Sequence, residues 1–165
     1  MNAMAPTRPT ELYWHCVPLT AGPAAAAEAR GQVRAAICAW EAPIDAGVAV
    51  LLTSELVTNA IRQEAGKLVT LAISCSCGQL RVDVHDTSRS LPVLVDAPAD
   101  AEAGRGLMLV ATLSSQWGFY PTPTGKAVYF TLAFKPDLPK SGGRGPRGFI
   151  RGGGESDPPP ARRPH

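Results

Sequence analysis

The chain has 165 residues, of which 45% are hydrophobic and 18% are charged, and its formal net charge is +2. This length and composition suit one globular domain with a real core, and they exclude a fibrous or wholly disordered protein. No apolar run reaches the roughly 18 residues of a membrane span, and the N-terminus lacks the basic start and apolar segment of a signal peptide, so we expect a cytoplasmic protein.

The net charge is unevenly distributed. From Lys135 to the C-terminus, seven Lys and Arg stand against three Asp and Glu, so the rest of the chain is mildly acidic. The basic segment, 135–165, is rich in Gly, Pro and Arg, and we predict that it is disordered. Its arginines leave open a weak nucleic-acid tether, but the acidic body predicts no nucleic-acid-binding fold, and we expect no nucleic-acid partner.

The first half of the domain begins with a short strand and continues with two helices. An aromatic, alternating run predicts a strand over 11–17, which we expect to end at the prolines of 18–23. Apolar residues at helical intervals predict a helix over 24–40. A second helix is expected over 46–64, with Asp45 as its N-cap.

The middle of the chain predicts an antiparallel hairpin. Apolar and polar residues alternate over 68–75 and again over 80–85, and Cys77-Gly78 forms a short turn between the two runs. Cys75 and Cys77 are two residues apart in a strand-like run, and we expect them to be small buried apolar residues on one face, not a disulfide. The three scattered histidines do not indicate a zinc site.

After the hairpin comes a long aperiodic segment, 87–103, of the kind that often forms a lid or a binding loop. A third helix is predicted over 106–115, and a second hairpin has strands over 117–120 and 127–134.

This order of elements predicts an α+β fold, a two-layer sandwich with helices on one face of a mixed, mostly antiparallel sheet. We expect a flexible leader over 1–10, one domain over 11–134 and the tail over 135–165.

Glu55 and Asn59 form the most informative pair in the sequence. A spacing of four places both side chains on one helical face, beside leucines. A carboxylate and an amide there are costly to bury unless something binds them, and hydrated Mg²⁺ with phosphates would do so. The alternative is an ordinary polar stripe at a helix surface.

Three further segments carry candidate binding groups. Asp86 ends a strand and could accept a hydrogen bond from an exocyclic amine, or could cap its own turn. Gly104-Arg105-Gly106 precedes Leu107 at the expected start of a helix and could hold phosphate, or could serve as a hinge. Thr124 and Lys126, in the second hairpin turn, could contact a nucleotide or could belong to a plain turn.

The ordered set resembles the GHKL (Bergerat-fold) ATPase superfamily. Ser54-Glu55-Leu56-Val57-Thr58-Asn59-Ala60 looks like its N box, Asp86 stands where the first glycine box would be, and Gly104-Arg105-Gly106-Leu107 stands where the second would be. Trp117-Gly118 and the run from Gly125 to Phe130 are similar to the closing segments of the small anti-sigma factor serine/threonine kinases of the RsbW and SpoIIAB type. The Ala-, Pro- and Arg-rich composition fits an actinobacterial source.

The resemblance implies ATP and Mg²⁺ as cofactors. It implies that Glu55 is the general base, that Asn59 holds Mg²⁺ through the phosphates, and that Asp86, with Ser88 beside it, binds the adenine amine. Phosphates would lie on the backbone of the second glycine box, with Arg105 assisting. Thr124 and Lys126 would be further ATP contacts.

The chain departs from the family pattern after Asp86. The first glycine box is often Asp-x-Gly-x-Gly, but Ser88 and Ser90 replace both glycines here.

The resemblance as a whole implies an anti-sigma factor kinase that phosphorylates an antagonist protein with Mg-ATP. The alternative is a degenerate module that binds nucleotide and partner without transferring phosphate. The expected partners are a sigma factor, an anti-anti-sigma antagonist or both, and a homodimer is a further alternative.

Overall fold

A computed structural model describes residues 12–63, 68–89 and 102–135. The predicted leader, most of the predicted tail and most of the predicted lid lie outside these ranges. The elements in chain order are β1 (Tyr13–Thr20), α1 (Ala25–Ala39), α2 (Ala46–Gln63), β2 (Leu68–Ser76), β3 (Gln79–Asp86), α3 (Glu102–Leu113), β4 (Gln116–Thr122) and β5 (Gly125–Ala133).

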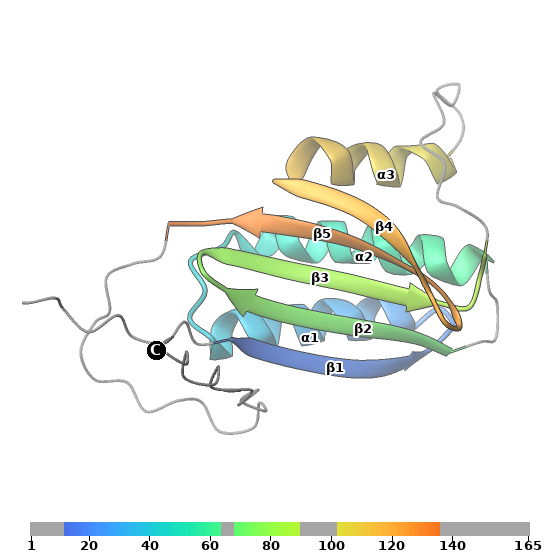
Figure 1. Ribbon diagram of the computed structural model, residues 1–165, viewed down its shortest axis with the longest axis horizontal. Helices are drawn as coiled ribbons and strands as arrows, with labels where there is room; N and C mark the ends of the chain where they lie inside the picture. The colour runs from blue at the N-terminus through green and yellow to red at the C-terminus, as the bar shows by residue number, and fades with distance from the viewer. Residues whose placement is uncertain (1–11, 64–67, 90–101, 136–165) are drawn as a thin grey trace, which may run out of the picture.

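Within the described residues, the strands form one five-stranded sheet in the order β1-β2-β3-β5-β4, and every pairing is antiparallel. Figure 1 shows α1 and α2 side by side behind this sheet, with α3 beyond them next to β4. The other face of the sheet carries no helix of the described chain. The predicted α+β two-layer sandwich is thus confirmed, and its sheet is fully antiparallel in the described part.

The core lies between the sheet and the helices. On the central strands β3 and β5, every second side chain enters it: Leu80, Val82 and Val84 from β3, and Val128, Phe130 and Leu132 from β5. The helices add aliphatic side chains, among them Val33, Ile37, Leu52, Leu56 and Val57. The strict alternation that predicted the strands therefore also decides which face of the sheet is buried.

Two local predictions are confirmed in detail. The Asp45 carboxylate accepts hydrogen bonds from the backbone N–H groups of Gly47 (2.9 Å) and Val48 (3.2 Å), so Asp45 caps α2 as expected. Cys77 and Gly78 both have positive φ, at 43° and 77°, as a tight two-residue hairpin turn requires. The expectation that Cys77 is buried like Cys75 was wrong, because β2 ends at Ser76 and Cys77 is exposed in the turn.

Three predicted boundaries were wrong. Pro18 does not end β1, because β1 is an edge strand, where a residue without an N–H is tolerated. The third helix starts at Glu102, four residues before Gly106. The second hairpin is longer than predicted, and only Pro123-Thr124 separates its paired strands, since Thr122 pairs with Gly125.

Candidate functional site

The predicted site residues come from four elements that meet at one end of the sheet. Figure 1 shows the C-terminal half of α2, the end of β3, the start of β5 and the start of α3 at this end. The chain brings them there because β3 ends where β5, its antiparallel neighbour, begins.

Glu55 lies on α2 at the border between core and solvent, beside buried Leu56, and its side chain is half-buried. Its carboxylate faces the backbone of Gly106 on α3. A Cβ built on Gly106 would collide with Glu55 Oε2 and would lie 3.4 Å from Cδ. The absence of a side chain at Gly106 therefore gives the Glu55 carboxylate its place between the two helices.

The polar side of α2 continues on both sides of Glu55. Asn59 follows one turn later and is also half-buried. Ser54 accepts a hydrogen bond of 2.8 Å from Nη1 of Arg30 on α1, which ties the two helices together next to Glu55.

Asp86 is buried at the end of β3 and has two donors on one oxygen. The Ser88 backbone N–H donates to Oδ1 at 2.9 Å, and Lys126 Nζ lies 3.2 Å from the same oxygen. The Asp86 and Lys126 side chains are only 2% and 6% exposed, so this is a buried ion pair. Lys126 was expected in a turn, but it lies within β5, directly opposite Asp86.

The second glycine run is helical. Gly104 and Arg105 were expected just before the helix, but they lie in the first turns of α3, because the helix already begins at Glu102. Gly106 faces Glu55, Arg105 is exposed, and Leu107 is a core residue with 4% exposure. Leu107 therefore anchors this turn of α3 in the core.

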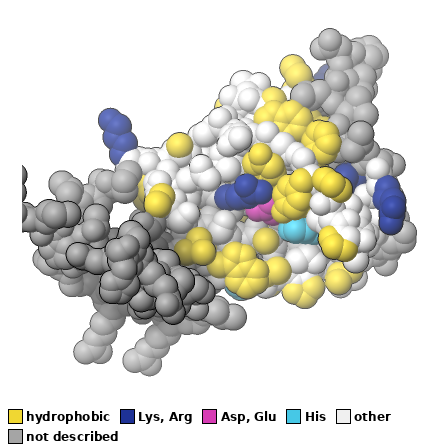
Figure 2. Space-filling model, viewed as in Figure 1, with side chains coloured by type: hydrophobic (Ala, Val, Ile, Leu, Met, Phe, Trp, Pro, Cys, Tyr) yellow, Lys and Arg dark blue, Asp and Glu magenta, His cyan; other side chains and the backbone are white. Residues whose placement is uncertain are grey.

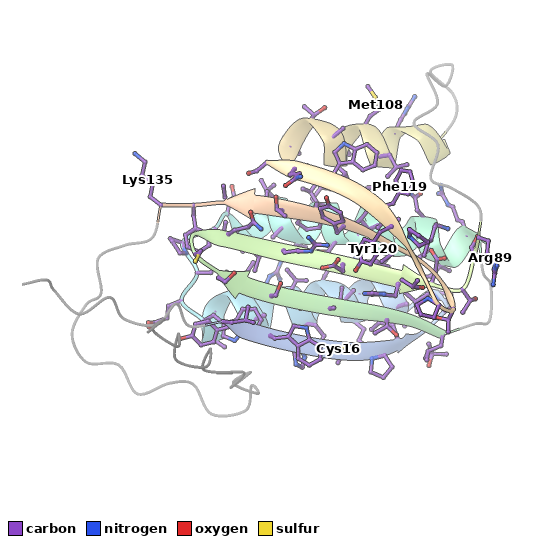
Figure 3. The ribbon with its side chains drawn as sticks, in the orientation of Figure 1. Cys16, Arg89, Met108, Phe119, Tyr120 and Lys135 are labelled. Atoms are coloured by element: carbon purple, nitrogen blue, oxygen red, sulfur yellow. The ribbon has the colours of Figure 1, made fainter. Side chains whose placement is uncertain are left out.

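Thr124 is separated from this group by the sheet. It is exposed in the β4–β5 turn and lines a hollow of about 430 Å³ on the helix-free face, together with Trp14, Cys16, Thr70, Ala72, Asp83, His85 and Tyr120. Figure 2 views this face, and Figure 3 labels Cys16 and Tyr120 on it. The hollow and the Glu55–Gly106 contact thus lie on opposite sides of the sheet.

A second buried carboxylate, Asp83, lies in the hollow, and no sequence motif pointed to it. Arg81 donates to both Asp83 oxygens (2.9 and 2.8 Å), and the Tyr120 hydroxyl donates to Oδ1 at 3.0 Å. The Arg81 guanidinium also stacks over Tyr129, 3.9 Å from the ring centroid. The alternation that turns Arg81 and Asp83 away from the core was visible in the sequence, but their partners on β4 and β5 were not.

These contacts shift two pKa values. The hydrogen bond to Asp83 raises the pKa of Arg81. Burial, followed by the nearby Asp83 charge, raises the pKa of Tyr120. Both shifts favour the protonated forms that make the cluster.

The amide oxygen of Asn59 is a hard donor of the kind that Mg²⁺ takes, and Mg²⁺ commonly completes its shell with waters and substrate phosphates. No cluster of three or more His, Cys, Asp or Glu within the described ranges could hold a metal by itself.

Among the helices that the structure describes, none combines the length and the hydrophobicity that a membrane span requires.

Comparison with known structures and families agrees with this architecture. The crystal structure of the RsbU and RsbW domains of Rv1364c from Mycobacterium tuberculosis superposes with a TM-score of 0.56 at 21% identity. The match covers 74% of this chain but only 33% of the other, and at this identity it shows the fold alone. No curated protein matches the sequence.

A family model does match. The model of the histidine kinase-like ATPase domain covers residues 19–132, which is most of the chain and includes every predicted site residue. ATP is the ligand that such a domain implies. The chain therefore belongs to the histidine kinase-like ATPase domain family.

Proposed function

We propose that the protein is an ATP-dependent serine/threonine kinase of the anti-sigma type, which phosphorylates a small antagonist protein and binds a sigma factor. The observation that carries the proposal is the contact between Glu55 and the Gly106 backbone, because it brings a candidate base to a glycine turn at the start of a helix. The fold that the proposal requires is shared with a crystal structure that contains an RsbW domain.

In this proposal Glu55 takes the proton from the attacking serine hydroxyl of the antagonist. The backbone of the first turns of α3, around Gly104 and Gly106, favours the negative charge of the phosphates, and Arg105 adds a positive charge at the rim. Asn59 would hold Mg²⁺, which when bound neutralises phosphate charge. Asp86, which Ser88 and Lys126 hold in place, accepts a hydrogen bond from the adenine amine.

In this proposal the two carboxylates have different tasks. Glu55 is half-buried beside a backbone, where a substrate hydroxyl can approach it, whereas Asp86 is buried and already paired. A paired, buried carboxylate suits recognition, and an accessible one suits proton transfer.

The test is phosphate transfer to a candidate antagonist with labelled Mg-ATP, together with equilibrium ATP binding. Wild type should bind ATP saturably and label a serine. Glu55→Gln should keep ATP affinity within a few-fold and slow the transfer by about 10²–10⁴-fold. Failure of the wild type to bind ATP at millimolar concentration would refute the proposal.

The second candidate is a binding module without transfer. The observation that favours it is Ser88 and Ser90 in place of glycines. In this case wild type would bind ATP and its partner, no serine would be labelled, and Glu55→Gln would change neither affinity.

A further inference from the structure

The buried pair of Asp86 and Lys126 has a definite place in the architecture. Asp86 continues the inward row of Leu80, Val82 and Val84 on β3, and Lys126 begins the inward row on β5. The register pairs the two residues directly. Both charges therefore lie on the helix-covered face, at the end where the core gives way to the candidate site.

The surrounding backbone fixes this arrangement. Gly125 packs against the end of β3 so closely that an added Cβ would lie 2.6 Å from Thr87 Cα. Lys126 and the Ser88 N–H both donate to Oδ1 of Asp86. Since both of these donors hold Oδ1, they restrain the carboxylate from one side, and we assign the contact with a ligand donor to Oδ2.

Lys126 is poorly suited to hold phosphate. Its ammonium lies 3.2 Å from a carboxylate that is 2% exposed. Moving it to a phosphate would leave Asp86 as an uncompensated buried charge, which is strongly unfavourable.

We infer that Lys126 is a positioning residue for base recognition: it acts through Asp86, presenting Oδ2 to the exocyclic amine of the base, and it does not contact the phosphates. The inference rests on the proposed nucleotide function and assigns Lys126 to the base end of the ligand. Its chemical consequence is selection of a purine that carries an amine donor over one that carries a hydrogen or a carbonyl at that position.

The experiment compares dissociation constants of ATP, adenosine, purine riboside and inosine for wild type, Lys126→Met, Lys126→Arg and Lys135→Met. Purine riboside lacks the amine, and inosine carries a carbonyl there. Lys135 is the control because it is exposed at the end of the described chain, and Figure 3 shows it far from Arg89 at the site end of the sheet.

Wild type should prefer adenosine over purine riboside by about tenfold or more, the worth of one hydrogen bond to a charged group. Lys126→Met should lower adenosine affinity and bring this preference close to one, while the ratio of ATP to adenosine affinity stays unchanged. Lys126→Arg should restore part of the preference, and Lys135→Met should match wild type.

The inference is overturned if Lys126→Met leaves adenosine affinity intact and lowers the ratio of ATP to adenosine affinity, because the ammonium would then act on phosphate. It is also overturned if wild type shows no preference for the amine. If Lys126→Met does not fold, Lys126→Arg decides: a reduced adenosine preference with an unchanged ATP-to-adenosine ratio supports the inference, and the reverse refutes it. A wild type that binds none of the four ligands would instead refute the proposed function itself, and the inference with it.

Discussion

The Glu55 carboxylate on α2 occupies the space that a side chain on Gly106 of α3 would fill. Two segments separated by about fifty residues in the sequence thus share one small volume. The contact links the orientation of Glu55 to the presence of a glycine on another helix.

Gly106→Ala should impair function more than stability. The new methyl group would displace only the far end of the Glu55 side chain, which can rotate, so the free energy of unfolding should stay within about 1 kcal/mol of wild type. The carboxylate would lose its position, and phosphate transfer should fall by about tenfold or more. Denaturant unfolding and labelled transfer measure the two effects.

Gly31→Ala is the matched control. Gly31 lies in α1, and a Cβ there would meet nothing within 4 Å. The exchange should therefore raise stability by about 1 kcal/mol through helix propensity and leave transfer unchanged. Equal losses of transfer in both variants would contradict the role of the Gly106 contact.

Gly125→Ala should be destabilising, in contrast. Its Cβ would lie 2.6 and 2.8 Å from Thr87 Cα and C, and these backbone atoms cannot rotate away. The end of β3 would have to separate from β5, at a cost of at least about 2 kcal/mol. Urea unfolding checks this, with Gly22→Ala as the control, since its nearest contact is a carbonyl oxygen at 4.0 Å. A cost no larger than that of the control would show that the strand ends are loosely joined.

Tyr120 should make the protein sensitive to alkali. Burial and Asp83 raise its pKa in the folded state. Its contribution to stability is therefore complete below about pH 10, the pKa of an unfolded tyrosine, and is lost as pH rises towards the higher folded-state pKa. Tyr120→Phe should be less stable at neutral pH and should show a shallower alkaline decline in unfolding free energy than wild type. Parallel declines in the two proteins would rule out this role.

The cysteines should differ in reactivity. Cys75 is 6% exposed, and burial raises the pKa of its thiol, whereas Cys77, two residues away, is exposed in the turn. At neutral pH a water-soluble maleimide should modify Cys77 and Cys38 well before Cys75, and denaturant should abolish the difference. Mass spectrometry of timed samples measures the order. Modification of Cys75 and Cys77 at the same rate in the native protein would mean that β2 opens readily.

The sequence by itself determined the elements and their inward faces. Alternation located β2 and β3, helical periodicity located α1 and α2, and the cap at Asp45 and the turn at Cys77-Gly78 were predictable because they depend on neighbouring residues. The placement of Glu55 and Asn59 on one face of α2 was predictable for the same reason, since the two residues are one helical turn apart.

The tertiary structure decided what depends on distant parts of the chain. Alternation does not say which strand pairs with which, so the register that sets Asp86 against Lys126, forty positions later, was not predictable. Likewise, Pro18 could remain in a strand only because β1 is at the edge of the sheet, and Gly106 could be assigned to Glu55 only once α3 packed beside α2. Neighbouring residues determine local geometry such as caps and turns, whereas the packing of the whole core determines which distant segments pair.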